Sequence, residues 1–178
     1  MNQPTEDDDF VQFVRARQGT LLRAARLYCG DPHIAEDLLQ EAFVKLASRW
    51  ESVRDGSPDA YVRRILYRDS VSRWRKWGRE RPYAAGPGER DVFDTGPVSS
   101  GVDEWVAGAP VREALAQLPP RQRAVIVLRY FEDQSEAQIA EVLGTSAGTV
   151  KSQASKALAH LRRLMPEFVD AGMAEGGL

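Results

Sequence analysis

Side chains that could bind nucleic acid recur along one short stretch near the C-terminal end of the chain, between Ser146 and Leu158. They are Thr149, Lys151, Ser152, Gln153, Ser155 and Lys156. Lysine ammonium groups bind phosphate or guanine, hydroxyl groups bind phosphates and bases, and a glutamine amide can pair with the edge of adenine. No carboxylate lies between Gly144 and Met165, whereas a solvated helix face usually mixes both signs of charge. The stretch is therefore predicted to bind DNA, with an ordinary solvated helix as the alternative.

The residues around this stretch predict two short helices joined by a tight turn. Ile139, Ala140 and Leu143 fall on one face of the first helix. Gly144 can end that helix because glycine adopts the left-handed conformation without steric cost, and Ser146 is a good N-cap for the next helix. The apolar stripe of the second helix consists of Val150, Ala154, Leu158 and Leu161. The pattern predicts a helix-turn-helix, whose second helix enters the major groove of DNA.

A second candidate stretch, from Pro58 to about Arg79, is predicted to be one helix that combines cations with aromatic rings. Its candidate nucleic-acid ligands are Tyr61, Arg63, Arg64, Tyr67, Arg68, Arg73, Trp74, Arg75 and Trp77. Cations bind phosphate, and aromatic rings stack on unpaired bases at about 1–3 kcal/mol each, so the combination indicates opened or single-stranded nucleic acid. We expect Trp74 or Tyr67 to be partly exposed beside Arg68. The alternative is a basic helix whose aromatic side chains belong to the core.

Two further helices are predicted upstream, from Phe10 to about Cys29 and from Pro32 to about Trp50. The buried stripe of the second helix consists of Ile34, Leu38, Ala42 and Leu46. A different face of that helix carries Asp37, Gln40, Glu41 and Val44, with Phe43 beside them. This face is either a solvated surface with an incidental apolar edge or a docking surface for a partner helix. Composition alone leaves both interpretations open.

The composition divides the chain into two helical domains, so the predicted fold class is all-α. Residues 82–109 are rich in Gly, Pro and Ser, carry more acidic than basic residues and lack periodicity, which predicts a flexible acidic linker. The domains on either side are predicted to span residues 1–81 and 110–166. The second domain should contain helices on both sides of the Pro119-Pro120 break, followed by the helix-turn-helix. Residues 167–178 are predicted to form a disordered tail.

The composition also argues against several classes of protein. The chain has 178 residues and a net charge of −2, so it has no uniformly basic surface. Its one cysteine, Cys29, rules out an intrachain disulfide, and no apolar run could span a bilayer, so a soluble cytoplasmic protein is expected. His33 and His160 lie in different predicted domains, and no phosphate-binding glycine loop or nucleophile–base pair is present. We expect no catalytic site, no metal, no cofactor and no small-molecule substrate.

Four blocks of the sequence resemble one family of proteins. The blocks are AEDLLQEAFVKL (35–46), AYVRRIL with RWRKW (60–77), ALAQLPPRQRAVIVLRYFED (114–133) and SEAQIAEVLGTSAGTVKSQASKALAHLR (135–162). They are similar to bacterial RNA polymerase sigma factors of the extracytoplasmic-function group, in the sigma-70 family, of the actinobacterial SigE-like type. The resemblance covers most of the chain outside the linker and both tails, and its last two blocks in series are highly specific. It implies that core RNA polymerase and promoter DNA are partners, with an anti-sigma factor as a further candidate.

The same resemblance implies roles for three groups of residues. The group that would help to dock the clamp helices of the polymerase largest subunit is Asp37, Gln40, Glu41 and Phe43. The loop over residues 53–60 and the helix over 61–77 would melt and read the promoter −10 element. The group that would read the −35 element is Lys151, Ser152, Gln153, Ser155 and Lys156. The chain departs from many relatives at Arg68, where they carry asparagine, and at Gln153 and Ser155, where they are more basic or aromatic.

A different class of protein remains as the alternative, namely a self-contained helix-turn-helix transcriptional regulator with an N-terminal sensor domain. The basic aromatic stretch discriminates between the two, because a sensor domain has no need of cations interleaved with aromatic rings. A nucleic-acid enzyme would be a third class, and the lack of catalytic groups argues against it.

Overall fold

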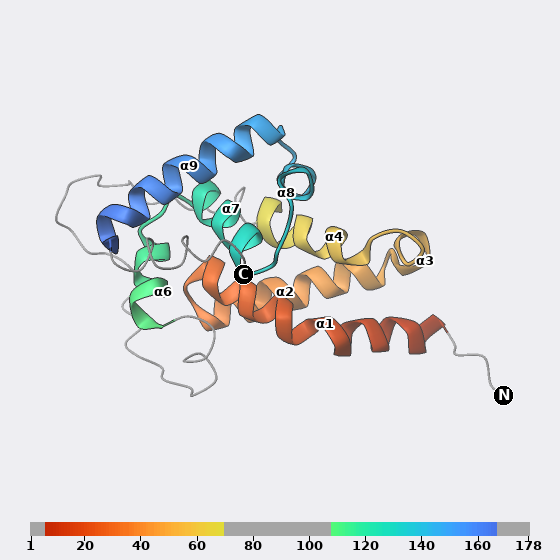
Figure 1. Ribbon diagram of the computed structural model, residues 1–178. Helices are drawn as coiled ribbons and strands as arrows, with labels where there is room; N and C mark the ends of the chain where they lie inside the picture. Colours follow the sequence, from red (N-terminus) through yellow and green to blue (C-terminus); the bar gives the residue numbers. More distant parts are fainter. Residues whose placement is uncertain (1–5, 70–107, 167–178) are drawn as a thin grey trace, which may run out of the picture.

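The computed structural model describes residues 6–69 and 108–166, and within these two ranges every regular element is a helix (Figure 1). The first range, here called the N-terminal part, contains α1 (Glu6–Cys29), α2 (Pro32–Ala47), α3 (Trp50–Val53), α4 (Pro58–Arg63) and η1 (Arg64–Asp69). The second range, the C-terminal part, contains α6 (Ala109–Ala116), α7 (Pro120–Tyr130), α8 (Glu136–Leu143) and α9 (Ala147–Leu164). The predicted all-α fold class is confirmed. Nearly all of the predicted linker and the predicted tail lie outside the described residues.

The junction between α1 and α2 follows from local sequence. Gly30 ends α1 with a φ of 75°, a backbone angle that glycine adopts without strain. The Asp31 carboxylate then accepts hydrogen bonds from the backbone N–H groups of His33 (2.8 Å) and Ile34 (3.1 Å), and Pro32 occupies the first turn of α2. These caps return the chain so that α1 and α2 lie side by side (Figure 1).

The end of α2 differs from the prediction. The helix was expected to reach about Trp50, but it ends at Ala47, and the short helix α3 begins at Trp50. The Trp50 ring packs against two rings of α1, with centroid distances of 5.3 Å to Phe10 and 5.5 Å to Phe13. Such aromatic packing contributes about 0.5–1.5 kcal/mol per pair beyond simple burial, which favours turning the chain back towards α1.

The predicted continuous helix from Pro58 to about Arg79 is only partly correct. Ser57 caps α4 as expected, with its side chain accepting from the Ala60 N–H at 3.3 Å. The α-helical pattern then stops at Arg63 and gives way to the π-helical turn η1. A π turn is wider than an α turn, so side chains beyond Arg63 leave the faces that a 3.6-residue period assigns to them. Residues 70–79 lie outside the described residues.

The helix-turn-helix forms as predicted. Ser135 and Gln138 form a capping box at the start of α8, and Gly144 ends that helix with a φ of 63°. The Ser146 side chain caps α9 by accepting from the Thr149 N–H at 3.2 Å. The buried apolar residues of the two helices are Ile139, Val142, Val150, Ala154, Ala157 and Leu161. Two of them, Val142 and Ala157, extend the predicted apolar stripes.

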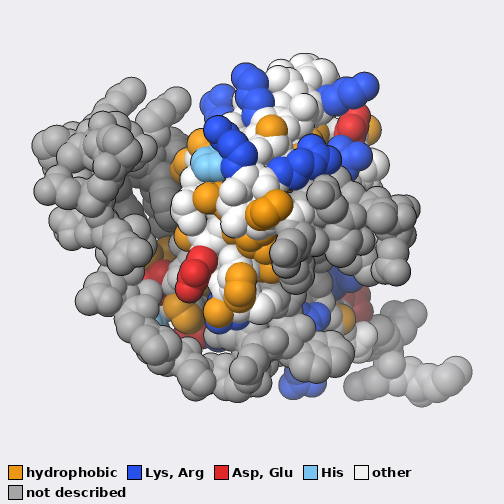
Figure 2. Space-filling model, turned by 60° about the vertical axis from the view of Figure 1, so that its left-hand side comes forward, with side chains coloured by type: hydrophobic (Ala, Val, Ile, Leu, Met, Phe, Trp, Pro, Cys, Tyr) orange, Lys and Arg blue, Asp and Glu red, His pale blue; other side chains and the backbone are white. Residues whose placement is uncertain are grey.

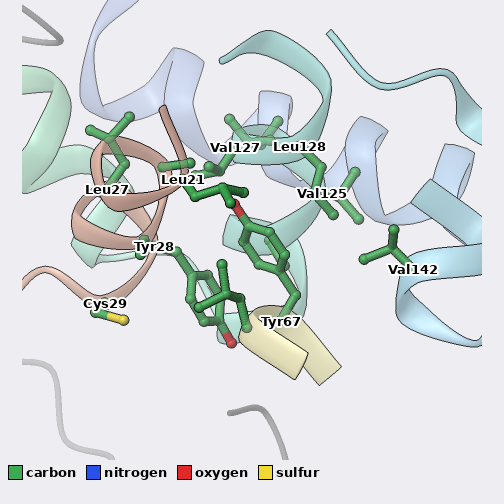
Figure 3. Close-up of a cluster of buried hydrophobic side chains, with 14 of the residues drawn as sticks. Leu21, Leu27, Tyr28, Cys29, Tyr67, Val125, Val127, Leu128 and Val142 are labelled. Carbon is green, nitrogen blue, oxygen red and sulfur yellow. The ribbon is translucent and has the colours of Figure 1, made fainter. Parts of the chain in front are cut away.

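The two parts of the molecule share one apolar core. Figure 3 shows Leu21 and Tyr28 of α1 together with Tyr67 of η1, facing Val125 and Leu128 of α7. The Tyr28 and Tyr67 rings meet edge to face, with 5.0 Å between their centroids. Helix α7 packs on α1, and α8 packs on α4 and η1 (Figure 1). The two predicted helical units are therefore stacked directly on each other.

Candidate nucleic-acid interface

The outer face of α9 is open to solvent. Of the six predicted ligands on this helix, five are exposed and Gln153 is half-buried. The exposed five are Thr149, Lys151, Ser152, Ser155 and Lys156. Val150, Ala154 and Ala157 point the opposite way and are buried against α7 and α8. Burial of one stripe of α9 thus leaves its polar side chains available to a ligand.

The electrostatic character of this face is positive. Lys151 and Lys156 are followed by Arg162 and Arg163, both exposed in the last turns of α9, and the helix contains no carboxylate. Figure 2 shows lysine and arginine side chains gathered over the upper part of the molecule, where α9 runs. Cations on one face attract the DNA backbone, and the amide and hydroxyl groups between them can read base edges. The Thr149 hydroxyl is partly committed already, since it lies 2.9 Å from the Ser146 hydroxyl.

The second candidate face, on α4 and η1, is mostly covered. Arg63 is buried, and Tyr67 has 0% of its surface exposed, so of the two rings of which one was expected to be partly exposed, Tyr67 is excluded. The physical reason is twofold: the π turn redirects Tyr67, and the C-terminal part packs on the face that results. Tyr61 and Arg64 are half-buried, and Arg68 is exposed. The remaining candidates, Arg73, Trp74, Arg75 and Trp77, lie outside the described residues.

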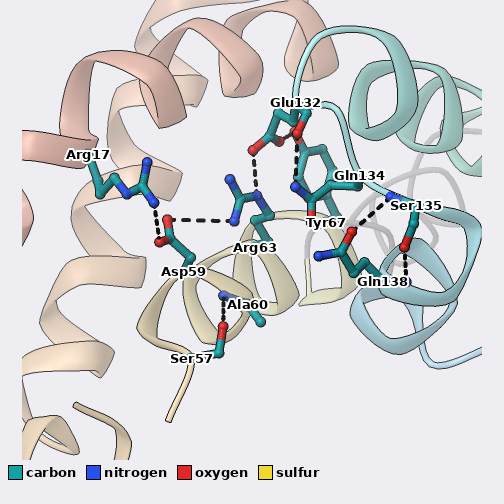
Figure 4. Close-up of polar contacts among 10 residues, drawn as sticks. All are labelled: Arg17, Ser57, Asp59, Ala60, Arg63, Tyr67, Glu132, Gln134, Ser135 and Gln138. Atoms are coloured by element: carbon teal, nitrogen blue, oxygen red, sulfur yellow. Dashed lines mark hydrogen bonds and ion pairs between the residues drawn. The ribbon is translucent and has the colours of Figure 1, made fainter. Parts of the chain in front are cut away.

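The cover on this face is centred on Glu132, in the loop between α7 and α8 (Figure 4). Arg63 Nε donates to Glu132 Oε2 at 2.5 Å, and the Tyr67 hydroxyl donates to Glu132 Oε1 at 2.5 Å. Arg63 Nη1 also lies 3.6 Å from the Asp59 carboxylate, which accepts from Arg17 Nη2 of α1 at 2.7 Å. Burial, reinforced by the Glu132 carboxylate, raises the pKa of Tyr67 well above its ordinary value.

A second polar contact joins the two parts at Arg123 of α7. Its buried guanidinium donates from Nη1 to the Tyr28 carbonyl at the end of α1 (2.9 Å), and from Nη2 to the Ala116 and Leu118 carbonyls (2.7 and 3.2 Å). Burial lowers the pKa of Arg123 and raises that of the neighbouring Cys29 thiol to about 12. A cation at a helix C-terminus is favourable, because the carbonyl groups there carry partial negative charge.

Sequence reasoning missed both Arg123 and Glu132. A signal for Arg123 was present, because it lies three and four residues before Ile126 and Val127, on a face that is buried. No periodic signal marks Glu132, which follows the end of α7 in a loop.

The candidate docking face on α2 lies off the buried stripe, as its spacing predicted. Asp37 and Gln40 are exposed, and Val44 exposes 69% of its surface. Glu41 is half-exposed and pairs with Lys45 of the next turn at 3.0 Å. Phe43 is only half-exposed, because it also packs against the core. The role of these residues in binding a partner stays a prediction.

Across residues 6–69 and 108–166, no three His, Cys, Asp or Glu side chains come together in a way that could hold a metal ion. None of the helices in these ranges is both long and apolar enough to cross a membrane.

The helix-turn-helix with its open basic face, joined to a second cationic helical unit, defines a DNA-binding protein of two helical units. Two family models match these units: residues 13–80 match sigma-70 region 2, and residues 109–161 match sigma-70 region 4. The RNA polymerase sigma-E factor of Streptomyces coelicolor is 38% identical over 169 residues, which cover 94% of this chain and 92% of that protein. The chain belongs to the sigma-70 family, as a sigma factor of the extracytoplasmic-function group.

More distant relatives agree with this assignment. The extracytoplasmic-function sigma factor SigM of Mycobacterium tuberculosis is 32% identical over 157 residues, covering 88% of this chain and 76% of that protein. Among solved structures, the sigma factor RpoE of Bartonella quintana, crystallised with the anti-sigma factor NepR, matches with a TM-score of 0.68. It is 27% identical, and the match covers 89% of this chain and 98% of that one. The sequence-based prediction of a sigma factor that directs transcription initiation is confirmed.

Proposed function

We propose that this sigma factor contacts its partners through three separate faces, and that it works in the cytoplasm with core RNA polymerase. The outer face of α9 reads the −35 element as duplex DNA. The face of α4 and η1, with the residues that follow it, contacts the opened −10 element. The exposed face of α2 docks on the polymerase. We further propose that residues 1–81 and 110–166 are the two domains that carry these faces.

The observation that carries the proposal is the arrangement of α9. Caps at Gly144 and Ser146 fix the turn between α8 and α9, and buried Val150 and Ala154 fix the rotation of α9 about its axis. Lysine, serine and glutamine side chains therefore project from one stable face with no acidic residue among them. This supports insertion of α9 into the major groove, where hydrogen-bonding side chains distinguish base pairs.

The docking role of α2 is supported by an unusual combination on one exposed face. Val44 is among the most exposed large apolar side chains of the described residues, and the polar Asp37 and Gln40 lie on the same side of the helix. An exposed apolar residue with a polar rim is typical of a protein–protein contact. Because the face is clear of the buried stripe of α2, a partner could bind it without disturbing the core.

An anti-sigma factor is a further proposed partner. The B. quintana relative was solved as a complex with such a protein, and the structure of CnrH with the cytosolic domain of CnrY also matches this chain. That second match has a TM-score of 0.58 and 25% identity, over 88% of this chain and 87% of that one. Similar folds in such complexes support a comparable regulator here.

The test is transcription from a genomic promoter library with core polymerase in the presence or absence of this protein. We expect a defined set of start sites that appear only when the protein is added. On its own, the protein should bind these promoters weakly, because one helix-turn-helix is a small reader. Tight, specific binding by the isolated protein, unchanged by core polymerase, would instead indicate the self-contained regulator.

A further inference from the structure

The cations of α4 and η1 all lie against the C-terminal part, and two of them form ion pairs with it. Arg63 pairs with Glu132, and Arg64 Nη2 lies 3.2 Å from Glu141 Oε1 of α8. The Arg68 guanidinium lies beside Gly144, where an added Cβ atom would be only 3.2 Å from Arg68 Nη1. Within the described residues these three arginines are the only cations of the two elements. The proposed −10 face is thus the surface on which the C-terminal part rests.

We infer that Glu132 is an autoinhibitory residue: in the free protein it occupies the −10 DNA-binding face of α4 and η1 through Arg63 and Tyr67, and it must leave before that face can contact DNA. The inference rests on the proposed −10 role of this face. It concerns how DNA access is controlled, which the proposed function leaves open.

Arg63 and Tyr67 bind the Glu132 carboxylate with donor groups that could also bind a phosphate. These three residues are here called the Glu132 contact. One carboxylate oxygen accepts from a guanidinium and the other accepts from a phenol hydroxyl (Figure 4). Arginine binds carboxylates and phosphates with the same donor geometry. The Glu132 side chain has no exposed surface, so no phosphate could reach these donors at the same time. DNA and Glu132 are therefore mutually exclusive ligands of Arg63 and Tyr67.

The loop that carries Glu132 holds its carboxylate in place. The Gln134 N–H donates to the Leu128 carbonyl at 2.9 Å, and the Gln134 side chain donates to the Glu132 carbonyl at 2.8 Å. Asp133, between Glu132 and Gln134 in the chain, has a φ of 50°, a left-handed backbone conformation that aspartate tolerates better than most residues. These hydrogen bonds lie within the loop and involve neither Arg63 nor Tyr67.

The closed arrangement blocks one DNA-binding face and spares the other. Lys151, Ser152 and Lys156 of α9 are exposed in the same structure in which Arg63 and Tyr67 are covered. A closed molecule could therefore meet duplex DNA through α9, whereas contact with an unpaired −10 strand requires the two parts to separate. The closed arrangement would therefore keep the free protein from binding single-stranded DNA.

The first test compares wild-type protein with Glu132→Gln, which removes one charge and keeps the shape of the side chain. Opening is followed by hydrogen exchange of peptides from α4, η1 and α7 in the free protein. DNA binding is followed by fluorescence anisotropy, with a labelled 20-nucleotide single strand of mixed sequence and with the duplex of the same sequence. If the closed form outnumbers the open form by about ten to one, full opening raises the apparent single-strand affinity about tenfold.

Three further variants are measured beside Glu132→Gln: one second test variant and two controls. Asp133→Asn removes the same charge from the same loop at an exposed position, so it controls for a general electrostatic effect on DNA binding. Glu141→Lys turns the exposed pair with Arg64 into a repulsion, and so loosens the same contact surface without altering a buried group. Glu113→Lys, at an exposed position on α6, makes the same charge change as Glu141→Lys and is its control. Circular dichroism shows whether each variant is folded.

The inference is supported if Glu132→Gln and Glu141→Lys both accelerate exchange and bind the single strand more tightly than their controls, while duplex affinity changes no more than in the controls. If Glu132→Gln is unfolded, Glu141→Lys alone decides the outcome. Unchanged exchange in the folded variants would overturn the inference, because the contact would not hold the protein closed.

Faster exchange with control-level single-strand affinity would also overturn it, because the covered face would then not be a DNA site in the free protein. A photo-crosslinking residue at Arg68 in the holoenzyme, on a promoter from the library, separates the two failures. A crosslink to the −10 strand leaves the proposed function intact and removes only the autoinhibition. Without a crosslink, the proposed −10 role fails as well.

Discussion

The outer face of α9 and the face formed by α4 and η1 have similar compositions and opposite environments. Both carry several cations, and both are predicted to contact DNA, yet the first is open and the second is covered by the C-terminal part. The difference arises from neighbours that are distant in sequence, since Glu132 lies 69 residues from Arg63 and 65 from Tyr67. A basic surface pattern therefore indicates what a helix can bind, whereas its packing decides when it can do so.

The largest expected effect is at the covered face. Tyr67→Ala should lower the free energy of unfolding by about 3–5 kcal/mol, because it removes a fully buried ring and leaves a cavity. Urea denaturation measures the change. Tyr130→Ala, on the exposed surface of α7, is the matched control and should cost less than about 1 kcal/mol. Equal costs for the two variants would mean that Tyr67 is not buried in solution.

Tyr67→Phe should have a smaller effect that depends on pH. It keeps the ring but removes one hydrogen bond to a buried carboxylate, which should cost about 1.5–3 kcal/mol at neutral pH. The pKa of Tyr67 is raised above its ordinary value of 10.0, so its protonated form stabilises the fold below about pH 10. This contribution is lost as the pH rises towards the folded-state pKa. Unfolding measured from pH 8 to 11 should therefore show a shallower loss of stability in Tyr67→Phe than in the wild type.

At the open face, substitutions should alter DNA binding and leave stability unchanged. Gln153→Ala should relax the preference at one base pair of the −35 element by about 1–3 kcal/mol. Lys151→Ala, if the lysine contacts phosphate, should weaken binding to all sequences alike and reduce the salt dependence by about one ion. Competition binding of the holoenzyme to −35 variants, at several salt concentrations, distinguishes the two. If both variants keep wild-type affinity and preference, α9 is not the reader.

The smallest effect on stability is expected at α2. The double variant Asp37→Ala with Gln40→Ala changes two exposed side chains, so its free energy of unfolding should stay within about 0.5 kcal/mol of the wild type. Its affinity for core polymerase should nevertheless fall, as measured by gel filtration or anisotropy. Glu51→Ala, also exposed but on α3, should alter neither property. Wild-type assembly by the double variant would remove this face from the docking site.

Local sequence predicted the capped helix boundaries well, because each cap depends on one or two neighbouring residues, whereas the ends of α2 and α4 have no such marker and were missed. Asp31, Ser57 and Ser146 cap their helices through their own side chains, and Gly144 ends α8 through its own backbone. The open face of α9 was predictable for the same reason, since its apolar stripe and its polar residues lie on one helix.

The covered face could not be predicted in this way. The exposure of Trp74 or Tyr67 was predicted from cations and aromatic rings that alternate in one stretch, a pattern that does not show the π turn from Arg64 to Asp69. The carboxylate that pairs with Arg63 comes from a loop in the other half of the chain, where no periodic pattern marks it. Only three-dimensional packing brings Glu132 and these two residues together.

The lone thiol of the chain offers a practical route to observing domain opening. Cys29 is buried, and this burial raises the pKa of its thiol to about 12, so the reactive thiolate is rare at pH 7. Maleimide dyes should therefore react with cysteines introduced on the surface and leave Cys29 untouched. Fluorophores placed on exposed positions such as Ser52 and Ala159 would then report the separation of the two parts in real time, in a protein whose native core is unaltered.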